Sequence, residues 1–351
     1  MELNDLIYKK SEWLKGNGPK SNIVMSTRIR VARNLAGHPF FNWAGEKQRA
    51  ETLNAMMAAL KNVGFLKGAL FLNIKDLSEV DRHFLVERHL MSKEHLSEVR
   101  DKGLVVGSEE MISLMLNEED HIRFQVLHSG FDIMESWRII DEIDNTLGKV
   151  FNFAYSNRFG YLTSCPTNTG TGLRCSVMLH LPALELVDQM GNVYEAVTKL
   201  GLTIRGFHGE GTEASGNFFQ ISNQVALGHS EMDIIDNLER VLNKIVKREE
   251  DVRAFLMKKK QQATMDSVYR AYGTLKSARI ITSRETIRLL SLVRLGVDLG
   301  FIAETDIFTI NEILLQMQPA HLQKINGREL SPQERDMKRA DIIREKLGGD
   351  K

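Results

Sequence analysis

Five arginines in the first two thirds of the chain are candidates for binding phosphate groups. They are Arg28, Arg30, Arg123, Arg174 and Arg205. A guanidinium group binds phosphate oxygens through two parallel hydrogen bonds and stays charged at physiological pH. Arg28 and Arg30 alternate with apolar residues, so a strand would project both side chains from one face. Taken alone, that pair is equally compatible with an ordinary exposed strand face.

Two acidic motifs accompany these arginines. Glu118, Glu119 and Asp120 directly precede His121, and Glu210 stands between two glycines. Adjacent carboxylates repel each other unless a cation is near, and flanking glycines permit close approach to a ligand. A solvated turn and a flexible loop remain alternatives on composition alone. Together with the arginines, the carboxylates indicate phosphoryl transfer to a basic group, which they would align and deprotonate.

Composition limits the class of protein. The chain has 351 residues, 42% of them hydrophobic, and its 46 basic and 46 acidic residues give no net charge. This balance argues against broad electrostatic binding to nucleic acid or to a membrane. Two cysteines, Cys165 and Cys175, are too few for a disulfide framework. With no signal peptide and no apolar run of about 18 residues, a cytoplasmic protein is expected.

Hydrophobic periodicity predicts an α+β part followed by an all-α part. Helices are predicted over Glu46–Val63, Thr171–Gln189, Glu285–Leu295, Asn311–Met317 and Pro332–Leu347, and a further helix begins after the capping residue Ser230. Strands are predicted over Ala69–Ile74, Val150–Thr163, Leu202–Phe207 and Asn217–Ala226. The predicted units are a short N-terminal segment (1–20), a catalytic domain (21–252) and a helical domain (253–351).

Two motifs resemble those of a known family. They are Asn117-Glu118-Glu119-Asp120-His121 with Arg123, and Cys165-Pro166-Thr167-Asn168 followed by Gly170–Arg174. Both are similar to the catalytic-domain signature of the phosphagen (guanidino) kinases. The similarity extends from about Ser21 to about Asp251, and a narrower similarity to bacterial protein-arginine kinases continues to the C-terminus. The resemblance implies an antiparallel sheet flanked by helices, followed by an all-α domain.

The resemblance also implies roles for individual residues. Glu119 and Glu210 would be the catalytic carboxylates, and Cys165 would tune the reacting guanidinium without forming a phosphoenzyme. An inert buried thiol is the alternative for Cys165. ATP would be the phosphoryl donor and would carry Mg²⁺ with it, so no resident metal is expected. The nucleotide-binding residues would be Ser26, Thr27, Arg28, Ile29, Arg30, His89, Arg123, Arg174, Cys175, Ser176, Val177, Met178, Arg205, Gly206, Phe207, His208, Gly209 and Glu210. Of these, Cys175 is expected on the helix after the glycine-rich turn, where a core position is the favoured interpretation.

A second candidate site lies near the C-terminus. Arg335-Asp336-Met337-Lys338-Arg339-Ala340 matches the RDxxRA motif of protein-arginine kinases. By that resemblance, Arg335, Asp336, Arg339 and Ala340 would form an allosteric site for phosphoarginine. Helical spacing places Arg335 and Arg339 about one turn apart on the same face. The alternative is a solvated helix surface with an Asp336–Arg339 ion pair.

These features predict a kinase that phosphorylates arginine side chains of proteins. Only about 20 residues precede the first arginine motif, whereas phosphagen kinases carry a helical domain there, so the site would admit a bulky protein. The resemblance implies that the product marks proteins for a Clp-type chaperone–protease in a stress response. It also implies a heat-shock repressor as a target, a zinc-binding activator protein and a homodimer.

Two other functions remain open at this point. One is a kinase for free arginine or another small guanidine, and the other is a silent phosphoarginine-binding adaptor. The presence of both catalytic glutamates argues against the adaptor. Thr169, Cys175 and His208 depart from the family pattern and bear on substrate preference.

Overall fold

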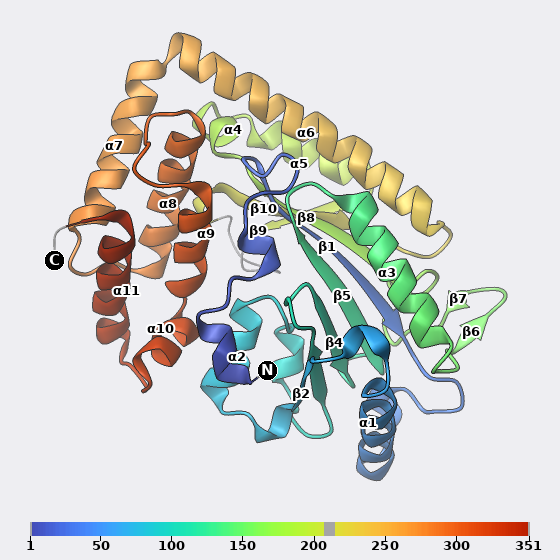
Figure 1. Cartoon of the computed structure of the whole chain (residues 1–351). Helices are drawn as coiled ribbons and strands as arrows, with labels where there is room; N and C mark the ends of the chain where they lie inside the picture. Colours follow the sequence, from blue (N-terminus) through green and yellow to red (C-terminus); the bar gives the residue numbers. More distant parts are fainter. Residues whose placement is uncertain (1, 207–214, 350–351) are drawn as a thin grey trace.

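A computed structural model describes residues 2–206 and 215–349 (Figure 1). Within these residues, an eight-stranded antiparallel sheet forms the centre of the molecule, in the order β2-β3-β4-β5-β1-β8-β10-β9. This confirms the predicted sheet. The strands are β1 (Val24–Arg33), β2 (Leu70–Asn73), β3 (Gly103–Val106), β4 (Ile112–Leu116), β5 (Ile122–Ser129), β8 (Leu173–His180), β9 (Leu202–Gly206) and β10 (Phe218–Asn223).

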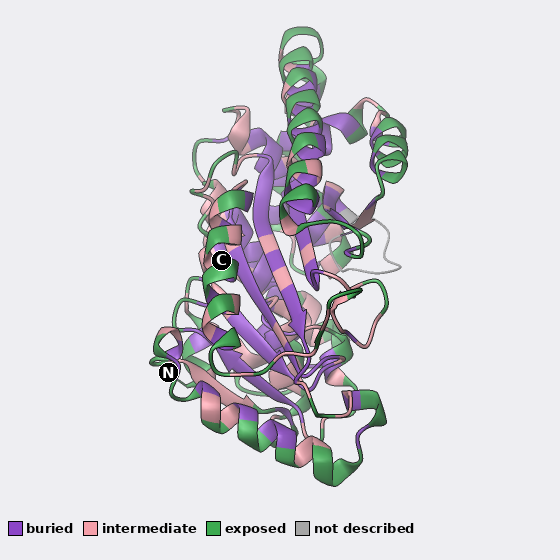
Figure 2. Ribbon diagram, turned by 90° about the vertical axis from the view of Figure 1, so that its right-hand side faces the viewer, coloured by how far each residue is buried: buried purple, intermediate pink, exposed green. Residues whose placement is uncertain are grey.

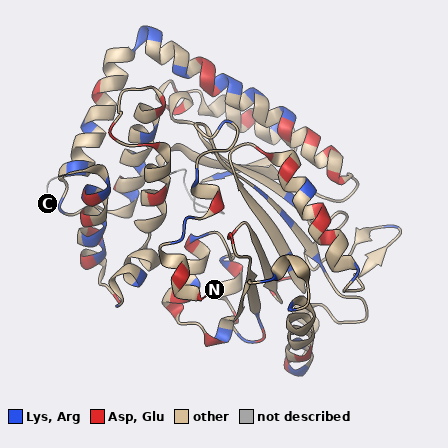
Figure 3. Cartoon of the chain, viewed as in Figure 1, with Lys and Arg blue, Asp and Glu red and all other residues tan. Residues whose placement is uncertain are grey.

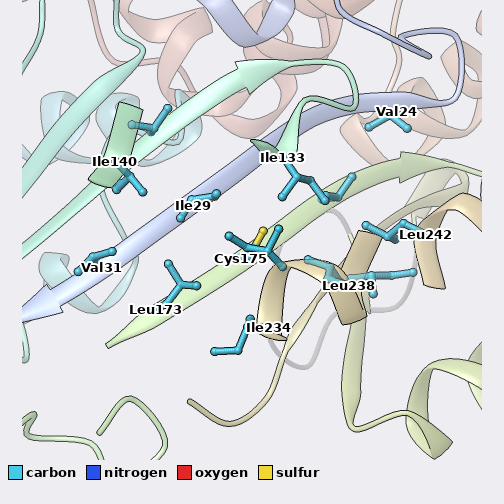
Figure 4. Close-up of a cluster of buried hydrophobic side chains, with 14 of the residues drawn as sticks. Val24, Ile29, Val31, Ile133, Ile140, Leu173, Cys175, Ile234, Leu238 and Leu242 are labelled. Carbon is cyan, nitrogen blue, oxygen red and sulfur yellow. The ribbon is translucent and has the colours of Figure 1, made fainter. Parts of the chain in front are cut away.

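One face of the sheet is apolar and covered by helices. Ile29 and Val31 of β1 and Cys175 and Val177 of β8 project into this core, as most of these side chains do in Figure 4. The covering helices are α1 (Glu46–Leu60), α3 (Ile133–Gly148), α5 (Met190–Lys199) and α6 (Glu231–Lys259). Figure 2 shows the strands largely buried and the outer sides of the helices exposed. Burial of this face fixes the register of the strands, because a one-residue slip would turn every apolar side chain outward.

The opposite face is apolar only towards its two ends. At one end, Leu104 and Met115 pack with Phe84 of helix α2 (Glu79–Glu87) and with Leu6. At the other end, strand residues such as Met178 pack against the C-terminal helices. The N-terminal segment packs against both apolar ends. Its first 3₁₀ turn, Leu3–Ile7, packs at the end that contains Phe84, and its second, Glu12–Leu14, at the end that contains Met178.

Five helices make up the C-terminal part, and they lie side by side in Figure 1. They are α7 (Gln261–Ser277), α8 (Ser283–Asp298), α9 (Ile307–Gln316), α10 (Pro319–Asn326) and α11 (Pro332–Leu347). The predicted helices in this part are confirmed. The predicted cap of α6 at Ser230 is confirmed as a capping box, and α11 also begins with a capping box, at Ser331. Helix α6 continues past residue 252 to Lys259, and the chain turns at Lys260.

Two predicted elements are wrong. The strand predicted over Val150–Thr163 is instead an irregular segment with a short hairpin, β6 (Tyr155–Ser156) and β7 (Gly160–Tyr161). The helix predicted over Thr171–Gln189 is strand β8 followed by the short helix α4 (Pro182–Leu186).

The glycine-rich turn before β8 explains the second error. Gly172 has a φ of +69°, and a Cβ there would lie 2.6 Å from the Ala32 carbonyl oxygen. This glycine therefore lets β8 approach β1 closely rather than beginning a helix. The apolar residues that follow, Leu173, Cys175 and Val177, alternate with polar ones as a strand requires.

None of the helices within the described ranges is long and apolar enough to cross a membrane.

Candidate active site

The central strands bring four of the predicted arginines together. Arg28 and Arg30 lie on the same face of β1, and Arg174 on β8 is directly opposite Arg30. Arg123 on β5 is opposite Ala32, which shares that face. Basic segments are visible on the central strands in Figure 3. The sheet thus gathers side chains that are far apart in the sequence onto one surface, between its two apolar ends.

Two of these arginines, Arg28 and Arg30, have lowered pKa values. Burial, together with the positive charges of Arg174 and Arg123, lowers the pKa of Arg28 to about 10. Burial and the charges of Arg28, Arg123 and Arg174 lower the pKa of Arg30 further. The Nε of Arg30 is buried and has no hydrogen-bond partner among the described residues. A surface of converging, desolvated guanidinium groups attracts a polyanion strongly, and a triphosphate chain fits this description.

The fifth arginine lies at the edge of the sheet. Arg205 on β9 is opposite Gln220 of β10, and the pairing with β8 places it on the same face as Arg28. Gly206 ends this strand. The other predicted residues of this segment, Phe207, His208, Gly209 and the catalytic candidate Glu210, lie outside the described residues.

Glu118 is bound to one of the arginines. Its Oε2 lies 2.7 Å from Arg123 Nη1, and its Oε1 accepts a hydrogen bond from Ser92. Burial alone would raise the pKa of this carboxyl group, but Arg123 and the two hydrogen bonds lower it to about 2. Glu118 is therefore ionised at neutral pH and orients Arg123.

Glu119 has the opposite environment. It is half-buried, and burial and the negative charge of Asp120 raise its pKa, with Glu118 adding to the effect. A hydrogen bond from the Cys165 side chain acts against this shift. The structure thus places the predicted catalytic carboxylate next to the predicted reactive thiol. A carboxylate with a raised pKa is a better proton acceptor.

Asp120 fastens the Cys165 loop to the acidic turn. Its Oδ1 accepts hydrogen bonds from the backbone N–H of Ser164 at 2.7 Å and from Asn34 Nδ2 at 2.6 Å. Ser164 Oγ donates to the carbonyl oxygen of Glu119 at 2.8 Å. These buried contacts fix the position of Cys165 relative to Glu119.

Sequence reasoning missed three supporting residues. Asn34 bridges Asp120 and the backbone N–H of His121, Ser92 holds Glu118, and Gln125 Nε2 donates to the carbonyl oxygen of His89 at 2.6 Å. Gln125 follows Arg123 by two residues, so strand alternation places both on one face. That alternation is the one signal that would have indicated Gln125. No local pattern indicates the others.

Three residues in the predicted nucleotide-binding set belong to the hydrophobic core, away from the arginines. The side chains of Ile29, Cys175 and Val177 lie in the hydrophobic core on the far face of the sheet, and Cys175 is labelled there in Figure 4. Burial raises the pKa of the Cys175 thiol. The expectation that Cys175 lies on a helix is wrong, whereas a core position is confirmed. These side chains cannot reach a nucleotide bound at the arginines.

Ser26 and Ser176, in the same set, lie on the arginine face of the sheet. Ser176 is paired with Arg28 across β1 and β8, and Ser26 is paired with Met178. Thr27 is paired with Val177 and therefore lies on the far face, where it is buried and its Oγ1 donates to the carbonyl oxygen of Gly130 at 2.8 Å. His89, at the end of α2, packs edge-on against Trp13 with ring centroids 4.9 Å apart.

The C-terminal motif forms part of a buried network. Arg339 pairs with Asp336, and it donates to the carbonyl oxygens of Met317 and Ile281 at 2.9 Å each. Arg339 and Ala340 are buried, whereas Arg335 is half-buried. The ion pair of the alternative interpretation is therefore present, although Arg339 lies beneath the helix surface rather than on it.

Two further features bear on cofactor binding. The described residues contain no group of three or more His, Cys, Asp or Glu side chains placed to hold a metal ion. An open hollow lined by Lys149, Phe151, Tyr155 and Tyr161 contains none of the predicted site residues.

Comparison with known proteins places the chain among guanidino kinases. Residues 51–252 match the model of the ATP:guanido phosphotransferase C-terminal catalytic domain. Residues 261–351 match that of the protein-arginine kinase McsB C-terminal domain. A protein-arginine kinase of Halothermothrix orenii is 45% identical over 348 residues, which cover 99% of each chain. One from Brevibacillus brevis is 44% identical over 340 residues, or 96% of this chain and 95% of the relative.

Two solved structures share the fold. A lombricine kinase has a TM-score of 0.60 at 24% identity, over 68% of this chain and 69% of its own. The duplicated taurocyamine kinase from Schistosoma mansoni, solved with bound transition state analog components, has a TM-score of 0.61 at 27% identity. That match covers 72% of this chain and 35% of the kinase.

The arginine cluster should lower the stability of the nucleotide-free protein while it strengthens nucleotide binding. Because Arg30 is repelled by its neighbours, Arg30→Met should raise the free energy of unfolding of the nucleotide-free protein by about 1 kcal/mol. The same change should weaken MgATP binding at least tenfold. Urea unfolding and calorimetry check the two effects. Arg138→Met, on the exposed face of α3, is the control and should alter neither by much. Lower stability with unchanged MgATP binding would contradict the role of the cluster.

The Glu119–Cys165 contact predicts a shift in the pH dependence of catalysis. If Glu119 accepts the proton, kcat/KM falls as the pH drops through its raised pKa. Cys165→Ala removes a hydrogen bond that lowers this pKa, so the acidic limb should move to higher pH. Cys165→Ser keeps a donor and should move it less.

Cys175→Ala is the control for this series, since that thiol lies behind the sheet. It should leave the acidic limb in place. A pH–rate profile that is identical for Cys165→Ala and the wild type would show that the two side chains do not communicate.

Proposed function

This chain belongs to the protein-arginine kinase family of ATP:guanido phosphotransferases, and we propose that it transfers the γ-phosphoryl group of ATP to arginine side chains of proteins. The observation that carries the proposal is the arrangement of one acidic turn. In this turn Glu119 lies next to Cys165, and its neighbour Glu118 pairs with Arg123 of the arginine cluster. The cluster provides a place for the phosphates, and Glu119 provides a place for a cationic acceptor.

The proposed reaction has one bond-forming and one bond-breaking event. A guanidino nitrogen of the target arginine attacks the γ-phosphorus, and the bond from that phosphorus to the β,γ-bridging oxygen breaks, releasing ADP. The nitrogen also loses a proton, because a guanidinium is a poor nucleophile. Glu119, assisted by Glu210, holds the guanidinium in line and accepts this proton. Arg28, Arg30 and their neighbours stabilise the charge on the phosphoryl group, together with Mg²⁺ bound to ATP.

A protein is the favoured acceptor over free arginine. The support comes from relatives that are named protein-arginine kinases and match nearly the whole chain. The C-terminal match adds to this support, because it covers a helical part that is described as belonging to protein-arginine kinases.

We also propose that the start of α11 binds phosphoarginine. Half-buried Arg335 and Asp336 would contact the ligand, while Arg339 holds the helix in place from below. Asp336 can pair with the guanidino nitrogens of phosphoarginine, which phosphoserine lacks, so the site would distinguish the two.

Calorimetry with free phosphoarginine tests this second site. Asp336→Ala should weaken binding at least tenfold, since it removes a charged hydrogen-bond partner. Asp341→Ala, one turn further along the same helix and paired with Arg344, is the matched control. Equal affinity for phosphoarginine in the wild type and both variants would favour the alternative, in which this helix is only a salt-bridged surface.

The cellular setting follows from family membership alone. In this proposal, phosphorylated proteins are passed to a Clp-type chaperone–protease during stress, and a heat-shock repressor is among the targets. A zinc-binding activator protein, a homodimer and a cytoplasmic location belong to the same proposal.

The decisive experiment compares acceptors. MgATP is incubated with the protein and either an arginine-rich protein or free arginine, and acid-labile phosphate is located by mass spectrometry at neutral pH. Phosphoarginine in the protein acceptor is expected, with little product from free arginine. Glu119→Gln should lower the rate at least 100-fold, because alignment and proton transfer are both lost.

Glu109→Gln, which changes an exposed acid in the turn at the other end of β4, is the control and should keep wild-type activity. Turnover close to wild type in Glu119→Gln would remove this residue from the mechanism. Preferential phosphorylation of free arginine would favour a small-molecule kinase instead.

A further inference from the structure

The end of α2 is bound to the start of α10 through one carboxylate. Glu87 Oε1 accepts a hydrogen bond from the backbone N–H of Ala320 at 2.8 Å. Its Oε2 accepts from the backbone N–H of His321 at 3.0 Å and lies 2.8 Å from His321 Nδ1. The first N–H groups of a helix need acceptors, and the N-cap residue Gln318 supplies none from its side chain. A glutamate from the catalytic part therefore caps a helix of the C-terminal part.

The next residue, Arg88, continues this connection. It is buried and makes two hydrogen bonds to Glu110, at 2.7 and 2.9 Å, and one to Ser11 Oγ at 2.6 Å. Its Nη1 lies 3.5 Å from His321 Nε2. A His321 ring that donates from Nδ1 to Glu87 presents its Nε2 lone pair to Arg88. Burial lowers the pKa of His321, which favours this neutral form. The His321 ring thus contacts both Glu87 and Arg88.

The backbone of the next residue, His89, is hydrogen-bonded to a strand of the candidate active site. His89 has a φ of 60°, a conformation that residues other than glycine adopt rarely and that neighbouring contacts must maintain. Its carbonyl oxygen accepts from Gln125, which is opposite Arg30 in the sheet. The conformation of His89 therefore depends on the sheet on one side and on the anchored end of α2 on the other.

We propose that Glu87 is a positioning residue for nucleotide binding, which holds His89 at the arginine face by capping α10. The inference rests on the proposed function, since it takes the arginine face to be the ATP site. Glu87 does not contact ATP in this arrangement. It acts through the turn Arg88-His89, whose position is set by the Glu87–His321 and Arg88–Glu110 contacts.

Helix α10 also extends the connection to α11. Arg339 Nε donates to the carbonyl oxygen of Met317, which directly precedes the N-cap Gln318. A ligand that changes the position of Arg339 would therefore change the N-terminus of α10, to which Glu87 is bound. Coupling between two sites requires such a shared element with a different arrangement in each state.

Nucleotide affinity tests the proposal directly. In Glu87→Gln, an amide N–H₂ faces the two N–H donors of His321, so the cap is weakened. We expect the Kd and KM for MgATP to rise three- to tenfold, with kcat at saturating MgATP within twofold of the wild type. Amide hydrogen exchange over residues 88–90 should be faster.

Asp81→Asn is the matched control. Asp81 lies on the same helix and pairs with Lys324 of α10 at 2.6 Å, but at the end of α2 that is far from His89. It should leave the affinity for MgATP unchanged. If Glu87→Gln lowers the melting temperature yet leaves the Kd and KM for MgATP at wild-type values, the contact is structural only and the proposal fails.

Two changes at His321 provide an independent readout. His321→Asn keeps an N–H donor near the Nδ1 position and should retain an affinity for MgATP close to that of the wild type. His321→Phe keeps a ring against Phe84 but has no donor, and should match Glu87→Gln. This pair decides the question even if Glu87→Gln does not fold. Equal affinity for MgATP in the two His321 variants would overturn the proposal.

The link to α11 is tested by adding free phosphoarginine. It should change the Kd for MgATP in the wild type and in Asp81→Asn but not in Glu87→Gln. A wild-type Kd that does not respond would overturn the link to α11 alone. Direct nucleotide binding needs no protein acceptor, so a failure to phosphorylate arginine would count against the proposed function and not against this inference.

Discussion

Mutual repulsion among the arginines is the constraint on which the rest of the structure depends. On a flexible surface Arg174 would move away from Arg28 and Arg30, because its positive charge adds to burial in lowering the pKa of both. The central strands prevent this, since the backbone hydrogen bonds fix their register and the side chains on the far face are locked into the hydrophobic core. The favourable burial of that core offsets the unfavourable gathering of charge on the other face. An anion that binds there relieves the repulsion. The electrostatic strain of the unoccupied face therefore favours anion binding.

Two adjacent carboxylates acquire different properties from their surroundings. Glu118 faces Arg123 and Ser92, which keep it ionised, so it serves to orient a guanidinium. Glu119 is hydrogen-bonded to Cys165 instead, and burial and Asp120 raise its pKa. The division gives one carboxylate a structural role and leaves the other available for proton transfer.

The sequence predicted those features whose cause is local. The capping boxes at Ser230 and Ser331 each need only four consecutive residues, and both helices begin where predicted. The alternation of Arg28 and Arg30 was likewise sufficient to place them on one face. Strand β8 was predicted as a helix because its glycine-rich turn resembles a helix start, whereas Gly172 in fact serves the close contact with β1. Asn34 and Glu87 gave no signal, because their partners lie far along the chain and appear only after the sheet and the C-terminal helices have assembled.

The C-terminal helices contribute to the geometry of the arginine strand itself. Arg294 of α8 is buried and donates to the carbonyl oxygens of Ser21 and Asn22, at 2.6 and 2.8 Å, directly before β1 begins. Arg253 near the end of α6 reaches the carbonyl oxygen of His180, where β8 ends. Buried hydrogen bonds to charged donors are among the stronger ones in proteins, and removing the donor would leave these carbonyls unsatisfied. Two of the strands that present arginines are therefore each held at one end by a helix, β1 by α8 and β8 by α6. A change in the packing of those helices would therefore shift the ends of β1 and β8 and, with them, the arginines. These contacts are separate from the one that Glu87 makes with α10.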